Sequence, residues 1–519
     1  MTGFVLVPEI HTGGWVWQDV AERLRAAGAG AYPVTLTGLG ERRDSAGPGT
    51  DLATHVDDVV RVIDRADEPA LVVVGHGVGV AAARGAAARP GPRGGRGGSR
   101  HPPPRGPGQP ALALLADQAL RESLTGGSGE PTPEDWQVRP PEAGEWHRFG
   151  SVDGVPADAL ALLHERAAAQ PLGTLTQPLP LPDGDGLARL SAAGVLCTAN
   201  GSSIAMLEAR LGVGDPALRA LADAGVSFFE LPTGHWPMLS SPDELTRVLL
   251  RAANGEGYRL PIAAAGEQPA HLRPFLLDVP DCRRVRTGRV DLYLPDGEGD
   301  FGGTEGPRPA VVFVHGGPLP ADTRPTPRDW PTFIGYGRYV ASLGAVGATV
   351  EHRLHGIGDY EQAAEDIAEA VALLRDDPRV DRDRVALWFF SGGGLLMADW
   401  LAAPPPWLRC LAANYPALAP LPNWGLDGTR FHPARIVAEP GGAPTPPIVL
   451  TRVGREWPEF TATVDEFLTA AAEGGTDAEI AEIIDVPQAH HGFETIDHTA
   501  EARDAVRRAV RAVLKRLRE

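Results

Sequence analysis

Residues 385–396 read Val-Ala-Leu-Trp-Phe-Phe-Ser-Gly-Gly-Gly-Leu-Leu, an apolar run that ends in a serine and three glycines. The run predicts a strand that ends at Ser391, and a helix-forming stretch begins at Leu395. A serine on a sharp strand-to-helix turn projects beyond the edge of its sheet, and small residues are needed beside it because strand and helix pass close together. We therefore predict that Ser391 is a nucleophile.

A second glycine turn lies upstream of this serine. Residues 310–314 form an apolar strand-like run, and His315, Gly316 and Gly317 follow it directly. Glycines allow a backbone N–H to turn toward a negative charge that develops on an oxygen beside the serine. We expect Gly316, Gly317 and Gly392 to form such an oxyanion hole.

Two further strand ends carry an acid and a base. Glu456 follows the apolar run at 447–452, and His491 follows the run at 483–487. Because the carboxyl ends of parallel strands meet at one edge of a sheet, Ser391, Glu456 and His491 are predicted to form a catalytic triad in that chain order. Other residues of the same types lie nearby, so the assignment leaves rivals open: Glu459 and Asp465 for the acid, and His490 for the base.

The ordered elements, together with His-Gly-Phe at 491–493, resemble the dienelactone-hydrolase and prolyl-oligopeptidase-like branch of the α/β-hydrolases over about residues 280–519. The resemblance implies a doubly wound, mostly parallel sheet flanked by helices, and a serine hydrolase that acts on an ester, thioester or lactone. Hydrolysis and acyl transfer remain alternatives. The sequence departs from the pattern at Phe389, where the family has glycine, and at Glu456, where aspartate is commoner.

The first half alternates strand-like and helix-like runs, which predicts another parallel sheet. Its motifs at 11–17, 36–42, 51–59 and 233–238 resemble the esterase and hydroxynitrile-lyase-like branch of the same fold, over roughly residues 3–90 and 190–253. That branch implies a serine at position 77 and a catalytic histidine at position 235. This chain has Gly77 and His235, and Asn200 follows the strand after which an acid is expected. We therefore expect a degenerate first site without a nucleophile.

A length of 519 residues favours two domains. We expect two tandem α/β-hydrolase domains: a degenerate one at 1–254, a linker at 255–274 and the domain with the triad at 275–519. Within the first, residues from about 120 to 190 are expected to form a cap. The low-complexity run at 90–110 holds no apolar residue except proline, so it is not expected to supply a buried strand.

Two other interpretations of that run stay open. It could reflect a local frameshift in GC-rich DNA, or an RGG-like segment that binds nucleic acid. The net charge of −19 argues against nucleic acid and against an anionic membrane as partners of the whole chain.

Three cysteines without a C-x-x-C spacing indicate neither a disulfide framework nor a zinc site, and they favour a reducing cytoplasm. The N-terminus lacks the basic start and the long apolar run of a signal peptide. We expect no cofactor and no metal, a small-molecule ester, thioester or lactone as substrate, and leave a homodimer open. The alternative function is a non-catalytic, hydrolase-like binding protein.

Overall fold

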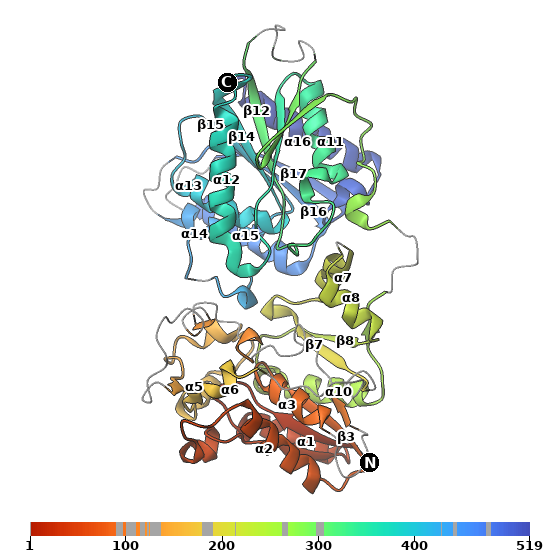
Figure 1. The fold of residues 1–519 in the computed structure, drawn as a ribbon, viewed down its shortest axis with the longest axis vertical. Coiled ribbons are helices and arrows are strands. Elements are labelled where there is room, and N and C mark those ends of the chain that lie inside the picture. The colour runs from red at the N-terminus through yellow and green to blue at the C-terminus, as the bar shows by residue number, and fades with distance from the viewer. Residues whose placement is uncertain are drawn as a thin grey trace. The chain divides into compact units, whose positions relative to one another are not determined.

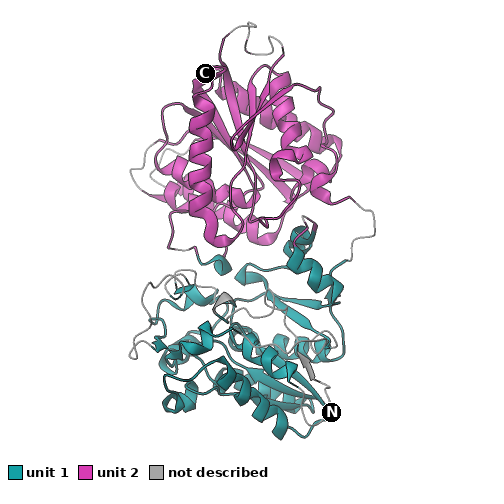
Figure 2. Cartoon of the chain, in the orientation of Figure 1, with its two compact units in different colours: residues 1–211, 216–263, 422–425 teal, residues 212–215, 264–421, 426–519 magenta. Residues whose placement is uncertain are grey.

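The computed structural model describes residues 2–89, 97–99, 111–114, 120–121, 124, 136–178, 190–212, 214–261, 268–296, 301, 306–426, 428–439, 444–473 and 479–519. The chain divides into two compact units (Figure 2). Unit 1 comprises residues 1–211, 216–263 and 422–425, and unit 2 comprises residues 212–215, 264–421 and 426–519. Each unit is built around its own sheets.

Unit 2 contains an eight-stranded sheet in the order β10-β11-β13-β12-β14-β15-β16-β17. Its strands from β12 onward are parallel, and β11 is antiparallel to both of its neighbours. The strands are β10 (Arg283–Thr287), β11 (Val290–Leu294), β12 (Arg308–Val314), β13 (Val346–Val350), β14 (Val380–Phe390), β15 (Leu408–Asn414), β16 (Ile448–Arg455) and β17 (Ile480–His490).

Helices cover both faces of this sheet, with α11 and α16 on one side and α12 on the other (Figure 1). Because both faces are buried, the central strands are continuous apolar runs rather than alternating ones. Every residue of β12 and β13 is buried accordingly. The helices of the unit are α11 (Pro331–Ser342), α12 (Tyr360–Arg375), α13 (Ala398–Ala402), α14 (Pro433–Ala438), α15 (Pro458–Glu473) and α16 (Ala500–Arg516).

The alternating run at 290–295 predicts an antiparallel strand at the sheet edge. The strand is antiparallel, but its place is wrong: β10 pairs with β11 from Arg283 to Thr287 and forms the edge instead. Every residue of β11 is buried, including Asp291, whose carboxylate accepts hydrogen bonds from Arg284 and Arg286. The buried charge is tolerated because it is paired.

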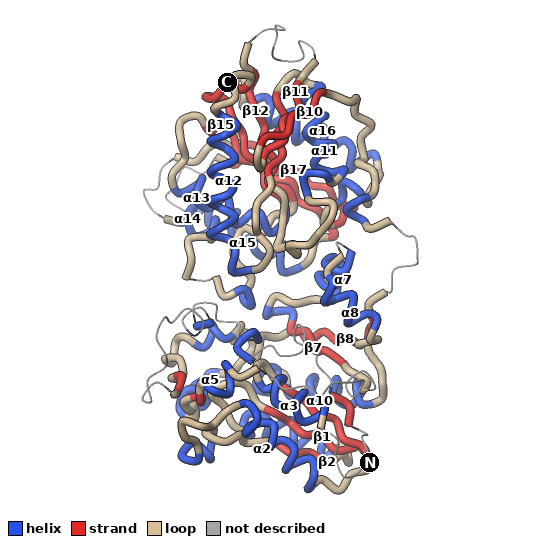
Figure 3. The backbone as a smooth tube through the Cα atoms, viewed as in Figure 1, coloured by secondary structure: helices blue, strands red, loops and turns tan. Residues whose placement is uncertain are grey.

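Unit 1 contains two separate larger sheets, β2-β1-β3-β4 and β7-β8-β9, and a two-stranded one, β5-β6. Figure 3 shows β1, β2, β7 and β8 of these sheets in red among the blue helices. The strands are β1 (Thr2–Val7), β2 (Gly30–Pro33), β3 (Ala70–Gly75), β4 (Gly97–Ser99), β5 (Gln137–Val138), β6 (Gln170–Pro171), β7 (Ala193–Cys197), β8 (Ser227–Leu231) and β9 (Tyr258–Arg259).

The helices of unit 1 pack around these sheets, and its core joins β1 and β3 to the apolar faces of α1, α2 and α10. Helix α2 begins at an Asp51 cap whose carboxylate accepts from the N–H of Thr54. The helices are α1 (Gln18–Ala26), α2 (Leu52–Arg65), α3 (Gly79–Ala88), α5 (Ala157–Glu165), α6 (Gly173–Thr176), α7 (Ile204–Gly212), α8 (Pro216–Asp223), α9 (Pro237–Ser240) and α10 (Pro242–Ala253).

Two expectations for unit 1 need correction. Gly97–Ser99 lies in the low-complexity run and yet pairs in parallel with Leu71–Val73 as β4. Strand pairing uses backbone N–H and C=O groups, so a short strand does not require apolar side chains. Tyr258–Arg259, in the expected linker, pairs with β8 as β9. The other residues of 90–110 lie outside the described residues.

The expected cap region is described in part, and there it holds β5, β6, α5 and α6. In the part of the chain that the structure covers, no helix has the length and apolar character needed to cross a membrane.

Candidate active site

Ser391 stands directly after β14, in the left-handed backbone conformation with φ of +52°. A Cβ on Gly393 would lie 2.6 Å from the carbonyl oxygen of His315, and one on Gly394 would overlap Ala417. The glycines are therefore required by the close approach of two backbone segments. Phe389, which replaces the family glycine, is fully buried in the sheet, so the turn forms without that glycine.

The side chains of Ser391, His491 and Glu456 lie in one hydrogen-bonded row. Ser391 Oγ is 2.7 Å from His491 Nε2. His491 Nδ1 is 2.8 Å from Glu456 Oε1 and 3.0 Å from Oε2. The serine follows β14, the acid follows β16 and the histidine follows β17, so three strand ends supply the row. The arrangement allows proton transfer from the serine to a histidine that the carboxylate orients.

Aromatic rings enclose the imidazole of His491. Trp457 stacks on it with ring centres 3.9 Å apart, and Tyr415 lies at 4.5 Å. The hydroxyl of Tyr415 donates to Glu494 Oε2 at 2.8 Å. The His491 and Glu456 side chains are 11% and 7% exposed, which limits access of water to their contact.

The rival residues lie elsewhere. The carboxylate of Glu459 is buried on the first turn of α15, and Asp465 is exposed further along the same helix. His490 points to Asp497, with Nδ1 3.1 Å from that carboxylate, and is exposed. Glu456 and His491, and not their rivals, are therefore the residues that join Ser391 in one hydrogen-bonded row.

The His-Gly-Gly turn lies against Ser391. A Cβ on Gly316 would be 2.8 Å from Ser391 Cβ, and one on Gly392 would overlap the carbonyl oxygen of Gly317. The turn is held from behind, since His352 Nε2 donates to the carbonyl of His315 at 2.9 Å. Burial lowers the pKa of His315 to about 4, so this histidine is neutral at physiological pH.

The tyrosine of α12 holds the other side of the turn. The hydroxyl of Tyr360 donates to the carbonyl oxygen of Gly392 at 2.8 Å. The bond fixes the peptide that follows Gly392 and so orients the backbone beside the serine.

Strand register identifies the corresponding positions in unit 1. Val314 of β12 pairs with Phe389 of β14, and Val7 of β1 pairs with Gly75 of β3. Two residues further on, Ser391 therefore corresponds to Gly77, and Gly316 corresponds to Glu9. Gly77 has a φ of +50°, nearly that of Ser391. The backbone turn is therefore similar at the two positions, although Gly77 has no side chain.

The carboxylate of Glu9 fills the space at Gly77. Any Cβ on Gly77 would overlap this carboxylate. Glu9 Oε1 accepts from the backbone N–H groups of Ile10 and Val78, both at 2.9 Å. The N–H of the residue after the nucleophile is an oxyanion-hole donor in this fold. In unit 1 that donor binds the protein's own carboxylate.

His235 and Asn200 complete the group. His235 Nε2 is 3.3 Å from Glu9 Oε2, and its Nδ1 is 3.4 Å from Asn200 Nδ2. Asn200 Oδ1 accepts from the N–H of Ser151 at 2.7 Å, so the amide presents its NH₂ group to the histidine. Burial acts to raise the pKa of Glu9, but the hydrogen bond from His235 and the nearby histidines outweigh it and lower that pKa overall.

Two buried carboxylates in these sites were not expected from the sequence. Glu9 lies two residues after β1, at the position where unit 2 has Gly316 of its His-Gly-Gly turn. This difference between the two halves was the sequence feature from which Glu9 could have been found. Glu494 is fully buried and accepts hydrogen bonds from Tyr336, Asn414 and Tyr415. No local motif marks it.

Comparison with known proteins agrees with this fold. The sequence model of the Alpha/beta hydrolase family matches residues 4–248. A carbendazim hydrolyzing esterase from Nocardioides sp. (strain SG-4G) is 37% identical over 93 residues, which are 18% of this chain and 38% of that protein. The chain therefore spans less than half the length of this curated relative.

Among solved structures, EstE1, a thermophilic carboxylesterase cloned from a metagenomic library, aligns with a TM-score of 0.37 and 17% identity. The alignment covers 47% of this chain and 92% of that one. Thermogutta terrifontis esterase 2 aligns with a TM-score of 0.34 and 17% identity, over 48% of this chain and 96% of that one. With parallel sheets flanked by helices and a match to this family's sequence model over residues 4–248, the chain has the α/β-hydrolase fold.

Proposed function

We propose that this protein is a serine hydrolase of carboxylic esters, thioesters or lactones, and that unit 2 carries the activity. The observation that carries the proposal is the row Ser391–His491–Glu456, with contacts of 2.7 and 2.8 Å. His491 takes the proton of Ser391 as Oγ attacks the substrate carbonyl, and Glu456 stabilises the resulting imidazolium. The imidazolium gives this proton to the leaving oxygen or sulfur as its bond to the carbonyl carbon breaks, which leaves an acyl-serine. Water, deprotonated by His491, then attacks the acyl-serine, and the released serine takes the proton back.

The oxyanion hole of this reaction is assigned to the backbone N–H groups of Gly392 and Gly317. They correspond by strand register to Val78 and Ile10, whose N–H groups both bind a carboxylate oxygen in unit 1. Two N–H donors that converge on one oxygen are what a tetrahedral intermediate needs. Gly316, which corresponds to Glu9, contributes by leaving the space beside Ser391 open.

Unit 1 is proposed to be inactive in ester turnover. Gly77 offers no nucleophile, and the NH₂ group of Asn200 faces His235 where an acid would be needed. With Nδ1 accepting from Asn200, the proton of neutral His235 resides on Nε2, so this nitrogen cannot act as the base.

A fluorophosphonate probe tests the proposal. We expect it to label Ser391 in the full-length chain, and we expect Ser391→Ala to abolish both labelling and hydrolysis of p-nitrophenyl esters while the fold remains. The loss should be at least about 10³-fold in kcat/KM. A variant that hydrolyses the esters as fast as the parent would rule out Ser391 as the nucleophile and favour a binding protein.

A further inference from the structure

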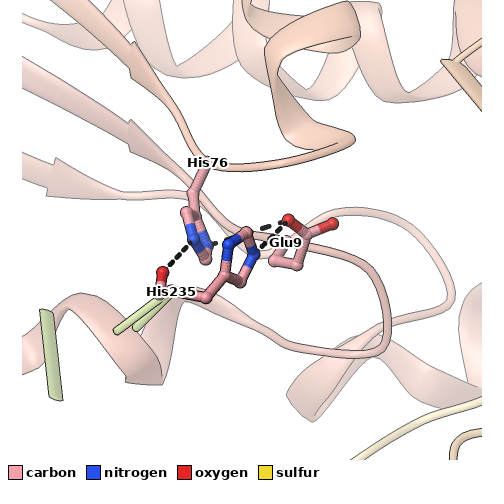
Figure 4. A group of neighbouring side chains, drawn as sticks. All are labelled: Glu9, His76 and His235. Atoms are coloured by element: carbon pink, nitrogen blue, oxygen red, sulfur yellow. Dashed lines mark hydrogen bonds and ion pairs between the residues drawn. The ribbon is translucent and has the colours of Figure 1, made fainter. Parts of the chain in front are cut away.

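Three potential metal ligands lie close together in unit 1, beside Gly77. Glu9 follows β1, His76 directly follows β3, and His235 lies between β8 and α9. Figure 4 shows that the two imidazole rings and the carboxylate point toward one another. One ligand atom from each residue lies within 4.8 Å of the others. Because the three residues are far apart in the sequence, no motif of closely spaced ligands predicts the group.

The distances suit a small divalent cation. Glu9 Oε2 is 3.3 Å from His235 Nε2 and 4.0 Å from His76 Nδ1. In a tetrahedral Zn²⁺ site with bonds of about 2.0–2.1 Å, two ligand atoms are roughly 3.4 Å apart. The pair of Glu9 and His235 already has this separation, and the pair of Glu9 and His76 needs to close by about 0.6 Å. The two imidazole nitrogens lie within 4.8 Å of each other. Two imidazoles and a carboxylate are a ligand set that zinc uses in proteins.

Neighbouring groups already hold the ligands in orientation. His76 Nε2 donates to the carbonyl oxygen of His235 at 2.8 Å, which directs Nδ1 toward Glu9. Glu9 Oε1 is held by the N–H groups of Ile10 and Val78, which directs Oε2 toward the two imidazoles. Such second partners fix the ligand atoms of metal-binding histidines and carboxylates.

The surroundings leave room for water as a fourth ligand. His76, Gly77 and His235 line a cavity of about 260 Å³, several times the roughly 30 Å³ that one water occupies. Gly77 is essential to the arrangement because any side chain there would overlap the Glu9 carboxylate. A buried carboxylate beside two imidazoles is also an environment in which a divalent cation offsets negative charge.

We propose that Glu9, His76 and His235 bind one first-row divalent cation such as Zn²⁺, through Glu9 Oε2, His76 Nδ1 and His235 Nε2. The site is independent of the esterase chemistry proposed for unit 2. For His235 to bind the ion through Nε2, the imidazole proton must reside on Nδ1, next to Asn200. The asparagine amide opposes this, since its NH₂ group faces that nitrogen.

The test uses the full-length chain, stripped with a chelator and then titrated with Zn²⁺ against a chromophoric competitor. We expect one ion per chain. Glu9→Gln, His76→Gln and His235→Gln should each weaken binding at least about 100-fold. His147→Gln, which changes an exposed histidine of the same unit, and His491→Gln in unit 2 should leave the affinity unchanged. Absence of uptake by the parent, or equal uptake by all variants, would overturn the proposal.

Two measurements do not depend on those variants folding. Co²⁺ bound to the parent should give the visible ligand-field bands of a four-coordinate N/O site, and thiolate charge-transfer bands would instead indicate Cys197, which lines the same cavity, and overturn the assignment. Asn200→Asp should tighten binding about tenfold, because a carboxylate accepts the Nδ1 proton of His235. Unchanged or weaker binding would contradict the ligand role of Nε2.

Discussion

At the scale of single residues, the two units differ by an exchange of side chains at two corresponding positions. Unit 2 has a side chain at Ser391 and none at Gly316, whereas unit 1 has a side chain at Glu9 and none at Gly77. Only one of the two positions can carry a side chain, because both point into the same space. The absence of a side chain at Gly77 and the presence of Glu9 are therefore structurally coupled.

Glu456→Gln tests the acid of the triad. The amide keeps the size of the side chain but does not hold the His491 tautomer or stabilise the imidazolium, so we expect kcat to fall by roughly 10²- to 10⁴-fold with little change in KM. Steady-state kinetics on p-nitrophenyl esters gives the answer. The matched control is Glu459→Gln on α15, which should be nearly silent in kcat. The reverse pattern would move the acid three residues along the chain.

Gly77→Ser tests whether a nucleophile alone would reactivate unit 1. The backbone at Gly77 already has the φ of a nucleophile turn, but the new side chain would collide with Glu9. In a Ser391→Ala background, we expect no ester turnover above that of Ser391→Ala and a lower melting temperature. The fluorophosphonate probe should not label the variant. A tenfold rise in turnover over the background would show that the Glu9 carboxylate moves out of the space beside residue 77.

At the scale of elements, the turn after β17 is tied to the sheet through the buried carboxylate of Glu494. Its oxygens accept from the hydroxyls of Tyr336 and Tyr415 and from the amide of Asn414. These donors come from α11 and from the end of β15, so one side chain joins three parts of unit 2. Burial raises the pKa of Glu494, and the donated hydrogen bonds offset part of that effect.

Glu494→Ala should be strongly destabilising. It leaves the buried hydroxyls of Tyr336 and Tyr415 without their acceptor and removes one of the two acceptors of the Asn414 amide. Each donor left unpaired costs about 1–3 kcal/mol. We expect the free energy of unfolding to fall by about 2 kcal/mol or more, measured by denaturant titration. Glu473→Ala, at the exposed end of α15, is the control and should change it by less than about 0.5 kcal/mol. Similar values for both variants would show that the network does not stabilise the unit.

At the scale of the whole molecule, the chain contains two compact units, and their strand ends carry different side chains. In unit 2, Ser391, His491 and Glu456 form a hydrogen-bonded row, whereas in unit 1 the carboxylate of Glu9 occupies the space beside Gly77. A shared fold therefore does not imply a shared function, since the function depends on the side chains at the strand ends.

His235→Ala tests this separation of roles. Because His235 has no nucleophile to deprotonate, we expect kcat/KM of the full-length chain for p-nitrophenyl esters to remain within about twofold of the parent. His491→Ala is the matched comparison in unit 2 and should lose at least about 10³-fold. A tenfold loss on His235→Ala would mean that unit 1 takes part in ester turnover.

The sequence by itself determined which strand ends meet at the candidate site of unit 2. Ser391, Glu456 and His491 each end a strand-like run, and the carboxyl ends of parallel strands share one edge of a sheet, so their meeting followed from local pattern and chain order. The glycines around Ser391 also predicted the sharp turn, because two backbone segments can approach this closely only where a Cβ is absent.

Only the tertiary structure decided which side chain occupies the space beside Gly77 in unit 1. Glu9 and Gly77 are separated by 68 positions, and whether the carboxylate reaches the vacant space depends on side-chain length and on N–H groups that two strand ends bring together. The same holds for Glu494, whose donors are 79 to 158 positions away. β4 also escaped prediction, because its pairing uses only the backbone. Local pattern sets which segments form strands, whereas contacts between distant side chains are set by packing.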